Sequence, residues 1–275
     1  MTQIHGVLPF ISQVLGWTYT SLWSLSFYPQ PILNYRRLST VGTSIDFSLL
    51  NILGYFTYLI YNATFYFSTQ IRFQYALKNN GLMPTVQLND IAYSIHAFIL
   101  TTIVYSQFLF SSWWGFEERK RALGARHSKV VYITFGCCLL GVFAVGILVL
   151  VKHLEDPLGR WAAIDIIYAI SYVKLVTTIF KYIPQVRINY VNKSTEGFAV
   201  DQILLDLSGG IASTLQLVVD SYYQGDWSGV TGNPTKLLLG NITIFFDVIF
   251  LTQHYCLYSD DNCHAIEEQE PLLEE

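Results

Sequence analysis

Residues Tyr28 to Gly54 read YPQPILNYRRLSTVGTSIDFSLLNILG, and residues Ile183 to Gly209 read IPQVRINYVNKSTEGFAVDQILLDLSG. When one stretch is shifted by 155 residues, the two match at 11 of 27 positions without gaps. The matches include Pro, Gln, Asn, Gly and Asp, which a chance likeness between two lipid-facing helices would not reproduce. The two stretches therefore predict an internal duplication.

The sequence around both stretches is strongly apolar. Of the 275 residues, 52% are hydrophobic and 13% are charged, whereas soluble domains carry about twice this charged fraction. Apolar blocks of roughly 20 residues, the length that crosses a bilayer, occupy residues 7–29, 43–67, 90–111, 130–151, 161–183, 199–220 and 237–258. The composition predicts an all-α polytopic membrane protein with seven transmembrane helices.

The first block and the cysteines narrow the class of protein. The six residues before the first block carry no basic segment, so we expect a retained span rather than a cleaved signal peptide. The four cysteines show no CxxC or metal-ligand spacing, so neither a disulfide framework nor a metal site is expected. The sequence contains no nucleophile–base pair and no phosphate-binding loop, and it predicts neither an enzyme nor a cofactor.

Lysine and arginine are distributed unevenly between the loops. One set of alternate loops holds nine of them: Arg36, Arg37, Arg119, Lys120, Arg121, Arg126, Lys129, Arg187 and Lys193. The other set holds five: Arg72, Lys78, Lys152, Arg160 and Lys236. Because cytoplasmic loops are enriched in these residues, we expect a luminal N-terminus and a cytosolic C-terminus.

The repeat spacing predicts the arrangement of the helices. Spans one and five enter the membrane in the same direction, and parallel repeats of this kind are related by an axis along the membrane normal. The expected arrangement is 3+1+3. It comprises a first triple-helix repeat (residues 1–111), a cytosolic loop and linker helix (112–160), a second triple-helix repeat (161–258) and a disordered acidic tail (259–275).

Each repeat carries a Pro-Gln pair near the cytosolic end of its first span, Pro29-Gln30 and Pro184-Gln185. Proline removes a backbone hydrogen bond and bends or ends a helix. A simple helix end would explain each proline. The recurrence at matched sites, each followed by a glutamine able to bond freed backbone groups, favours a pair of hinges.

Four segments together resemble the cystinosin family. They are SFYPQPILNYRRLSTVGTSIDF (residues 26–47), LNDIAYSIHA (88–97), KYIPQVRINYVNKSTEGFAVDQILLDLSGG (181–210) and FFDVIFLTQHYCLY (245–258). Members of that family carry two PQ-loop repeats, as SWEET-like carriers do, and export cystine from lysosomes or vacuoles together with protons. The resemblance implies the same fold and activity here.

Asn51 and Asp206 occupy matched positions inside the membrane, each followed three residues later by a glycine. A carboxylate inside a membrane costs about 2.5–3.5 kcal/mol on insertion scales and usually faces a cavity or a partner. Burial favours the protonated carboxyl group, so we expect Asp206 to accept the coupled proton, a role that the resemblance also implies. A static ion pair with a lysine is the alternative. Asp46 and Asp201, five residues earlier in each repeat, are expected to cap helices.

Lys174 and Lys181 lie seven residues apart, on one face of span five. Lys181 could extend to the cytosol, but Lys174 is too deep and needs an anion, which is either Asp206 or a substrate carboxylate. A substrate with two carboxylates and two ammonium groups would use the lysines for the former, and Asp206 and Asn51 for the latter. Gln202, on the Asp206 face, stands where the family more often has asparagine, which bears on the size of the cavity.

Four further residues are candidates for the same site. Phe27 and Tyr55 could pack against the substrate, although aromatic residues near a membrane interface often serve as anchors. Asp90 is either the N-cap of span three or, as the resemblance implies, a pH-responsive group. Asp247 is a buried carboxylate in span seven and a second member of a proton-coupling network.

The tail contains Glu268 with Leu272 and Leu273, in the pattern E-x-x-x-L-L. This pattern resembles signals that bind clathrin adaptors and direct proteins to lysosomes and vacuoles. The expected partners are therefore cystine, protons, the lipid bilayer and an adaptor; the resemblance adds a nutrient-sensing complex. Nucleic acid is not expected.

The sequence thus predicts a carrier that exports cystine with protons from an acidic organelle by alternating access. Two alternatives stay open. One is a PQ-loop exporter of another amino acid, and the other is a sorting or signalling receptor that binds a ligand without net transport. Net uptake into vesicles separates a carrier from a receptor.

Overall fold

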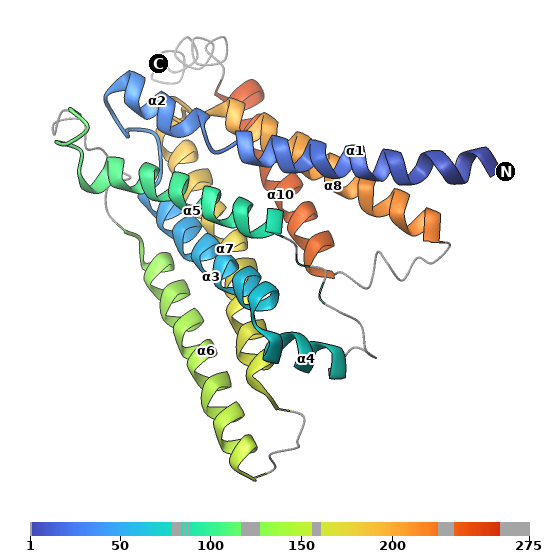
Figure 1. Cartoon of the computed structure of the whole chain (residues 1–275). Helices are drawn as coiled ribbons and strands as arrows, with labels where there is room; N and C mark the ends of the chain where they lie inside the picture. The colour runs from blue at the N-terminus through green and yellow to red at the C-terminus, as the bar shows by residue number, and fades with distance from the viewer. Residues whose placement is uncertain are drawn as a thin grey trace, which may run out of the picture. The chain divides into compact units, whose positions relative to one another are not determined.

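The computed structural model describes residues 2–78, 84, 86, 88–116, 127–155, 161–224 and 234–258. These residues form helices and no strands (Figure 1). The helices are α1 (Thr2–Leu25), α2 (Pro29–Arg37), α3 (Ile45–Phe67), α4 (Thr69–Lys78), α5 (Leu88–Leu109), α6 (Lys129–Glu155), α7 (Ala163–Asn192), α8 (Val200–Gln224), α10 (Pro234–Thr252) and the π-helical turn η2 (Gln253–Leu257).

The long helices coincide with the apolar blocks of the sequence. Within the described residues, four stretches are long and apolar enough to cross a bilayer: Asp90–Leu109, Lys129–Lys152, Ala163–Asn192 and Val200–Val219. Helix α3 covers another block but includes Asp46, Asn51 and Asn62, which lower its mean hydropathy. The crossing of the membrane by all seven helices stays a prediction.

The two Pro-Gln pairs lie in different local structures. The first apolar block is expected to continue to residue 29, but α1 ends at Leu25, and Pro29 lies in the first turn of the separate helix α2. A proline is well tolerated there because the first helical N–H groups have no partner within the helix. Pro184 lies inside α7, which continues to Asn192. The first of the duplicated prolines therefore starts a helix, and the second lies inside one.

The loops that follow the Pro-Gln pairs, residues 38–44 and 193–199, repeat each other's backbone. Leu38 and Lys193 both have φ of 48°, and Gly42 and Gly197 have φ of 94° and 89°. These are left-handed conformations in which glycine has no steric penalty. The shared dihedral angles extend the duplication from the sequence to the backbone of both loops.

The chain divides into two compact units, each of which takes helices from both halves of the sequence. The first unit contains α1, α2, α8, α10, η2, both loops, and the ends of α5 and α7. In this unit α8 lies between α1 and α10 (Figure 1). Gln216 of α8 donates to the Ser12 carbonyl of α1 at 3.1 Å. On the other side of α8, Gly210 allows Ile244 of α10 to come close.

The second unit contains α3, α4 and α6, α5 up to Tyr105, and α7 up to Lys181. Phe65, Ile71 and Ile164 form a buried cluster where α3, α4 and the start of α7 meet. Gln74 of α4 accepts a hydrogen bond from the Ile164 backbone N–H at 2.9 Å, and Lys78 pairs with Asp165 at 2.5 Å. Helix α4 thus holds the start of α7, although no sequence pattern predicted the helix α4.

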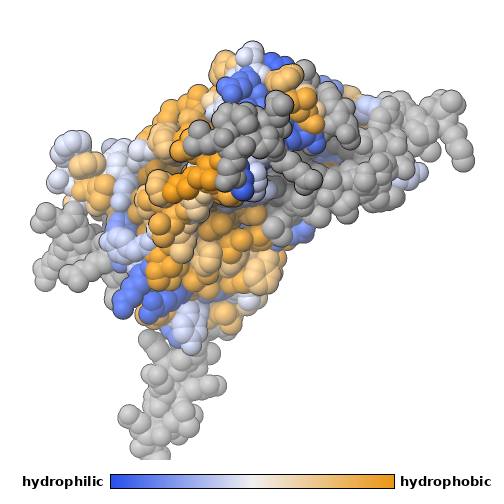
Figure 2. Space-filling model, turned by 90° about the horizontal axis from the view of Figure 1, so that it is seen from below, coloured by the Kyte–Doolittle hydropathy of each residue, from blue (hydrophilic) through white to orange (hydrophobic). Residues whose placement is uncertain are grey.

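Apolar side chains cover much of the exposed surface. Figure 2 shows a broad hydrophobic area on one face, with hydrophilic residues gathered in separate patches. On α6, Leu139, Leu140 and Phe143 are all more than half exposed. A soluble protein rarely leaves so many large apolar groups in water, whereas lipid accommodates them. The surface therefore fits a multi-pass membrane protein.

Candidate functional site

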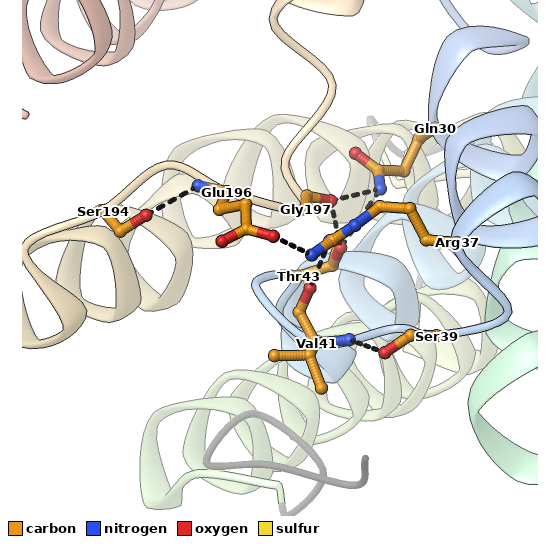
Figure 3. Close-up of polar contacts among 8 residues, drawn as sticks. All are labelled: Gln30, Arg37, Ser39, Val41, Thr43, Ser194, Glu196 and Gly197. Atoms are coloured by element: carbon orange, nitrogen blue, oxygen red, sulfur yellow. Dashed lines mark hydrogen bonds and ion pairs between the residues drawn. The ribbon is translucent and has the colours of Figure 1, made fainter. Parts of the chain in front are cut away.

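Gln30, the glutamine of the first Pro-Gln pair, binds the loop of the second repeat. Its Nε2 donates to the carbonyl oxygen of Gly197 at 2.9 Å (Figure 3). Its Oε1 accepts from the backbone N–H of Ala199 at 2.8 Å. The Gln30 side chain is buried, so both ends of its amide are satisfied by one loop from the other half of the chain.

Gln185, the matched glutamine, binds the loop of the first repeat in the same way. Its Nε2 donates to the Gly42 carbonyl at 2.8 Å, and its Oε1 accepts from the Ser44 N–H at 2.7 Å. We call this arrangement the crossed-glutamine cluster: Gln30, Gln185, Gly42, Ser44, Gly197 and Ala199. It fastens the two repeats to each other through buried hydrogen bonds at equivalent positions.

Four more buried amides support the crossed-glutamine cluster. Each of its glutamines donates at 2.8 Å to the asparagine four residues ahead. Asn34 then donates to Gln107 at 2.8 Å, and Asn189 donates to Gln253 at 3.0 Å. Each of these outer glutamines donates in turn to a backbone carbonyl of its own repeat. The network is duplicated, and buried amides that are bonded in this way hold a fixed arrangement.

Gly42 and Gly197 allow the two loops to come into close contact. A Cβ atom on Gly42 would collide with the carbonyl oxygen of Glu196, and one on Gly197 would collide with the carbonyl oxygen of Val41. Both glycines also have positive φ. Any other residue would therefore disturb both the backbone of its own loop and the contact with the other loop.

An ion pair occurs on one side of the cluster only. Arg37 Nη2 lies 2.6 Å from Glu196 Oε1, and Arg37 Nη1 donates to the Val41 carbonyl at 3.0 Å (Figure 3). The position matched to Arg37 is Asn192, and the position matched to Glu196 is Val41. The duplicated loops are therefore joined by a charged contact that the duplication does not repeat.

Asp206, the expected proton acceptor, lies half-buried on α8 in the first unit. The hydroxyl of Tyr182 donates to its Oδ2 at 3.4 Å. The indole N–H of Trp23 donates to its backbone carbonyl at 3.2 Å. Gly209, one turn further on, leaves room for the Trp23 ring against α8. Gly209 follows Asp206 by three residues, as Gly54 follows Asn51. This spacing allows α1 to pack closely beside the Asp206 carboxylate.

The matched site in the second unit contains the lysines and Asn51. Gly54 lets α7 come close to α3, with Lys174 and Thr177 against it. The Lys174 ammonium lies 3.5 Å from the centroid of the Tyr55 ring, a favourable cation–π distance. Lys181 is buried, and its ammonium lies 5.3 Å from the centroid of the Phe47 ring.

Asn51 is buried on α3, and its Oδ1 has no hydrogen-bond partner among the described residues. A buried amide oxygen without a partner is costly. Such a group can accept a hydrogen bond from a ligand that carries an N–H donor.

The remaining predicted residues are placed as follows. Gln202 is half-buried in the first turn of α8, and Phe27 is half-buried between α1 and α2. Asp90 lies in the first turn of α5, where its carbonyl accepts from Asn62 at 3.3 Å. Asp247 is fully buried on α10. The sorting residues Glu268, Leu272 and Leu273 lie outside the described residues.

Asp46 and Asp201 differ, although both are expected to cap helices. The Asp46 carboxylate accepts from the Ser128 N–H at 2.9 Å and lies 3.1 Å from Nδ1 of His127. It is buried and binds the residues just before α6, whereas Asp201 is exposed. The difference comes from His127 and Ser128, which supply polar partners to the Asp46 carboxylate.

Sequence reasoning missed several residues of these sites. Trp23 and Tyr182 contact Asp206 from other helices, and nothing in their local pattern predicts it. Gln107 and Gln253 could have been found, because each lies near the end of the third span of its repeat. Gln107 and Gln253 are 146 residues apart. A comparison of the two halves at a fixed shift of 155 residues therefore does not align them.

Comparison with known proteins agrees with this geometry. The family model described as "PQ loop repeat" matches residues 11–71 and 166–226, and each match includes one Pro-Gln pair. The "Cystinosin homolog" of Caenorhabditis briggsae is 35% identical over 96% of the chain and 63% of its own length. The chain therefore spans less than two thirds of that relative.

Two further relatives are covered more completely. The "Cystine transporter" of Saccharomyces cerevisiae is 28% identical over 95% of the chain and 99% of its own length. The "Cystinosin homolog" of Dictyostelium discoideum is 39% identical over 92% of the chain and 83% of its own length. The identity to the Dictyostelium protein extends over most of its length and most of the chain, and the chain also has two PQ-loop repeats. The chain therefore belongs to the cystinosin family.

Proposed function

We propose that the protein exports cystine, together with protons, from the lumen of an acidic organelle to the cytosol. The names of the relatives support cystine as the substrate. In this proposal the chain is a seven-helix carrier in a 3+1+3 arrangement, not an enzyme. Its N-terminus lies in the lumen of a lysosome or vacuole and its tail lies in the cytosol.

The crossed-glutamine cluster is the observation that carries this proposal. A carrier that works by alternating access needs a closure that forms at one end of the path and breaks once per cycle. The distribution of lysine and arginine assigns the cluster to the cytosolic end. Each hydrogen bond contributes about 0.5–1.5 kcal/mol net, so the four that Gln30 and Gln185 make across the repeats would hold a gate that ligand binding could open. Pro29 and Pro184 are the proposed hinges.

Cystine offers two carboxylates and two ammonium groups to the binding residues. Lys174 and Lys181 are proposed to bind the carboxylates. The Lys174 ammonium lies over the Tyr55 ring, and a substrate carboxylate would replace this weaker contact. Asn51 has an amide oxygen available for an ammonium group. Gln202 and Phe27 are proposed to complete the site.

Asp206 is the proposed carrier of the proton. A luminal proton neutralises its carboxylate, which weakens its hold on cations and frees the helices to move. Asp90 and Asp247 are the next candidates for the proton path. An adaptor at Glu268, Leu272 and Leu273, and a nutrient-sensing complex, are proposed partners outside the described residues.

The test is a proton current in vesicles when cystine is added on the acidic side. We expect a current in the wild type that is lost in Asp206→Asn. It should persist in Asp201→Asn, which changes an exposed carboxylate on the same helix. A current equal in all three would move the coupling to Asp247 or Asp90. Cystine binding without net uptake would favour a receptor, and a current with another amino acid alone would change the substrate.

A further inference from the structure

Tyr182 is a buried polar residue beside Asp206 that the proposed transport cycle does not yet use. It belongs to α7 and lies two residues before Pro184. Its side chain is 1% exposed, and its ring stacks on Phe246 of α10, with centroids 4.7 Å apart. A buried tyrosine usually directs its hydroxyl to a polar partner, and here that partner is the Asp206 carboxylate.

The hydroxyl connects three helices of the first unit. It donates to Asp206 of α8 at 3.4 Å. It also hydrogen-bonds with the Thr243 side chain of α10 and lies close enough to the Asp247 carboxylate for electrostatic interaction. One hydroxyl group therefore bonds to one acidic side chain and lies near a second one on another helix.

The 3.4 Å distance between Tyr182 and Asp206 suits a contact that forms and breaks. Most O–H···O bonds have a length of about 2.7–2.8 Å, so a small movement of α7 against α8 would either tighten or release this one. Tyr182 is close in sequence to the proposed hinge Pro184, and a bend there would move its hydroxyl.

We infer that Tyr182 is a positioning residue for the proton-coupling step: its hydroxyl stabilises the ionised Asp206 carboxylate and sets the luminal pH at which Asp206 is protonated. This inference rests on the proposed function. Tyr182 itself keeps its proton throughout. The proton that moves is the one that Asp206 binds from the lumen and later releases to the cytosol.

Other groups of this unit are also relevant to the pair of Tyr182 and Asp206. From α1, the Trp23 indole N–H bonds to the backbone carbonyl of Asp206. From α10, Asp247 lies near the same Tyr182 hydroxyl and carries the same sign of charge as an ionised Asp206. Lys174 and Lys181, the cations of the proposed site, are assigned to the other unit. Tyr182 is a hydrogen-bond donor that the first unit supplies to the carboxylate.

The test is Tyr182→Phe, which keeps the buried ring and removes only the hydroxyl. Without the donor, the ionised carboxylate is less stable and protons bind at a higher pH. A net hydrogen bond of about 1 kcal/mol corresponds to a shift of roughly 0.5–1 pH unit towards neutral. Two profiles should shift: the cystine-driven proton current against luminal pH, and the infrared band of the protonated Asp206 carboxyl against pH. The band is identified by its loss in Asp206→Asn.

The controls separate this inference from the proposed function. Tyr168→Phe removes a hydroxyl elsewhere on α7, in the second unit, and should leave both profiles unchanged. Thr243→Val is a second variant that alters the partner of the Tyr182 hydroxyl and should shift the infrared profile. The inference is overturned if Tyr182→Phe folds and titrates as the wild type does. It is also overturned if Tyr168→Phe shifts the profile equally. The infrared result is independent of transport, so a shifted band without any cystine current would refute the proposed function and retain the role of Tyr182.

Discussion

Gln30 and Gln185 each hold the other's repeat: Gln30 donates to the Gly197 carbonyl at 2.9 Å, and Gln185 donates to the Gly42 carbonyl at 2.8 Å. Both side chains are buried. Removing either amide therefore leaves buried backbone groups without a partner, at a cost of about 1–3 kcal/mol for each group. The two glutamines bind the same pair of loops. Losing one amide is therefore expected to weaken the hydrogen bonds that the other makes to these loops.

Gln30→Ala and Gln185→Ala should each lower the melting temperature of the purified protein and reduce transport. The double variant should lose less than the sum of the two single losses, because the first change already loosens the contact. Thermal unfolding in detergent measures this coupling. Gln70→Ala, at an exposed position of α4, is the control and should melt as the wild type does. Strictly additive losses would contradict a shared gate.

Gly42→Ala should prevent correct closure of the loops. The new methyl group would collide with the Glu196 carbonyl, and an alanine would be strained at φ of 94°. We expect a melting temperature several degrees lower and little transport. Gly136→Ala is the matched control, because a Cβ atom there meets no atom within 4 Å. It should be neutral or slightly stabilising, since alanine favours a helix. Equal losses in both variants would show that the loop contact is unimportant.

Arg37→Glu should shift the gate towards its open state without unfolding the protein. The Arg37–Glu196 pair is partly exposed, with 27% and 80% of the two side chains accessible. It therefore contributes about 1 kcal/mol or less to stability, but it is a contact that opening must break. A cysteine introduced beside the cluster should react faster with a cytosolic thiol reagent in this variant. Arg37→Glu combined with Glu196→Arg should restore the slow rate, and no rescue would argue against the pair.

Asp46→Ala should destabilise the protein far more than Asp201→Ala, although the two positions match in the repeat. Asp46 is buried and bonds to the Ser128 N–H beside His127, whereas Asp201 is exposed. Hydrogen bonds to a charged group contribute about 1.5–3 kcal/mol, and we expect a loss of that size for Asp46 and little for Asp201. Chemical denaturation in detergent compares the variants. If both variants lost a similar free energy of unfolding, both residues would act only as helix caps.

The repeated stretches predicted the parts of the fold that depend on local pattern. The apolar blocks placed the long helices. The matched Pro-Gln pairs were predicted to be hinges, and the contacts of their glutamines with the other repeat were not predicted. The pattern failed where tertiary contacts decide the outcome. Nothing near Pro29 distinguishes a helix start from a bend, yet α1 ends at Leu25 while α7 continues through Pro184. Helix α4 is short, and it contacts α7, which lies far away in the sequence.

The sequence suggested candidate site residues by their type, but it did not show which side chains contact them. A carboxylate in an apolar block indicates a special role wherever it lies, which singled out Asp206. The sequence could not show that its nearest donor is Tyr182, because that contact depends on how α7 packs against α8. The same holds for Asp46, which matches Asp201 in the repeat but bonds to the segment before α6.

The large sequence separation between Gln30 and its loop partners also has a consequence for biosynthesis. Its loop partners lie 167 and 169 residues further along the chain, so a ribosome must complete most of the protein before this side chain can be satisfied. Until then the first half lacks the loop to which Gln30 bonds in the complete protein. The crossed-glutamine cluster can therefore form only when both halves of the chain are present.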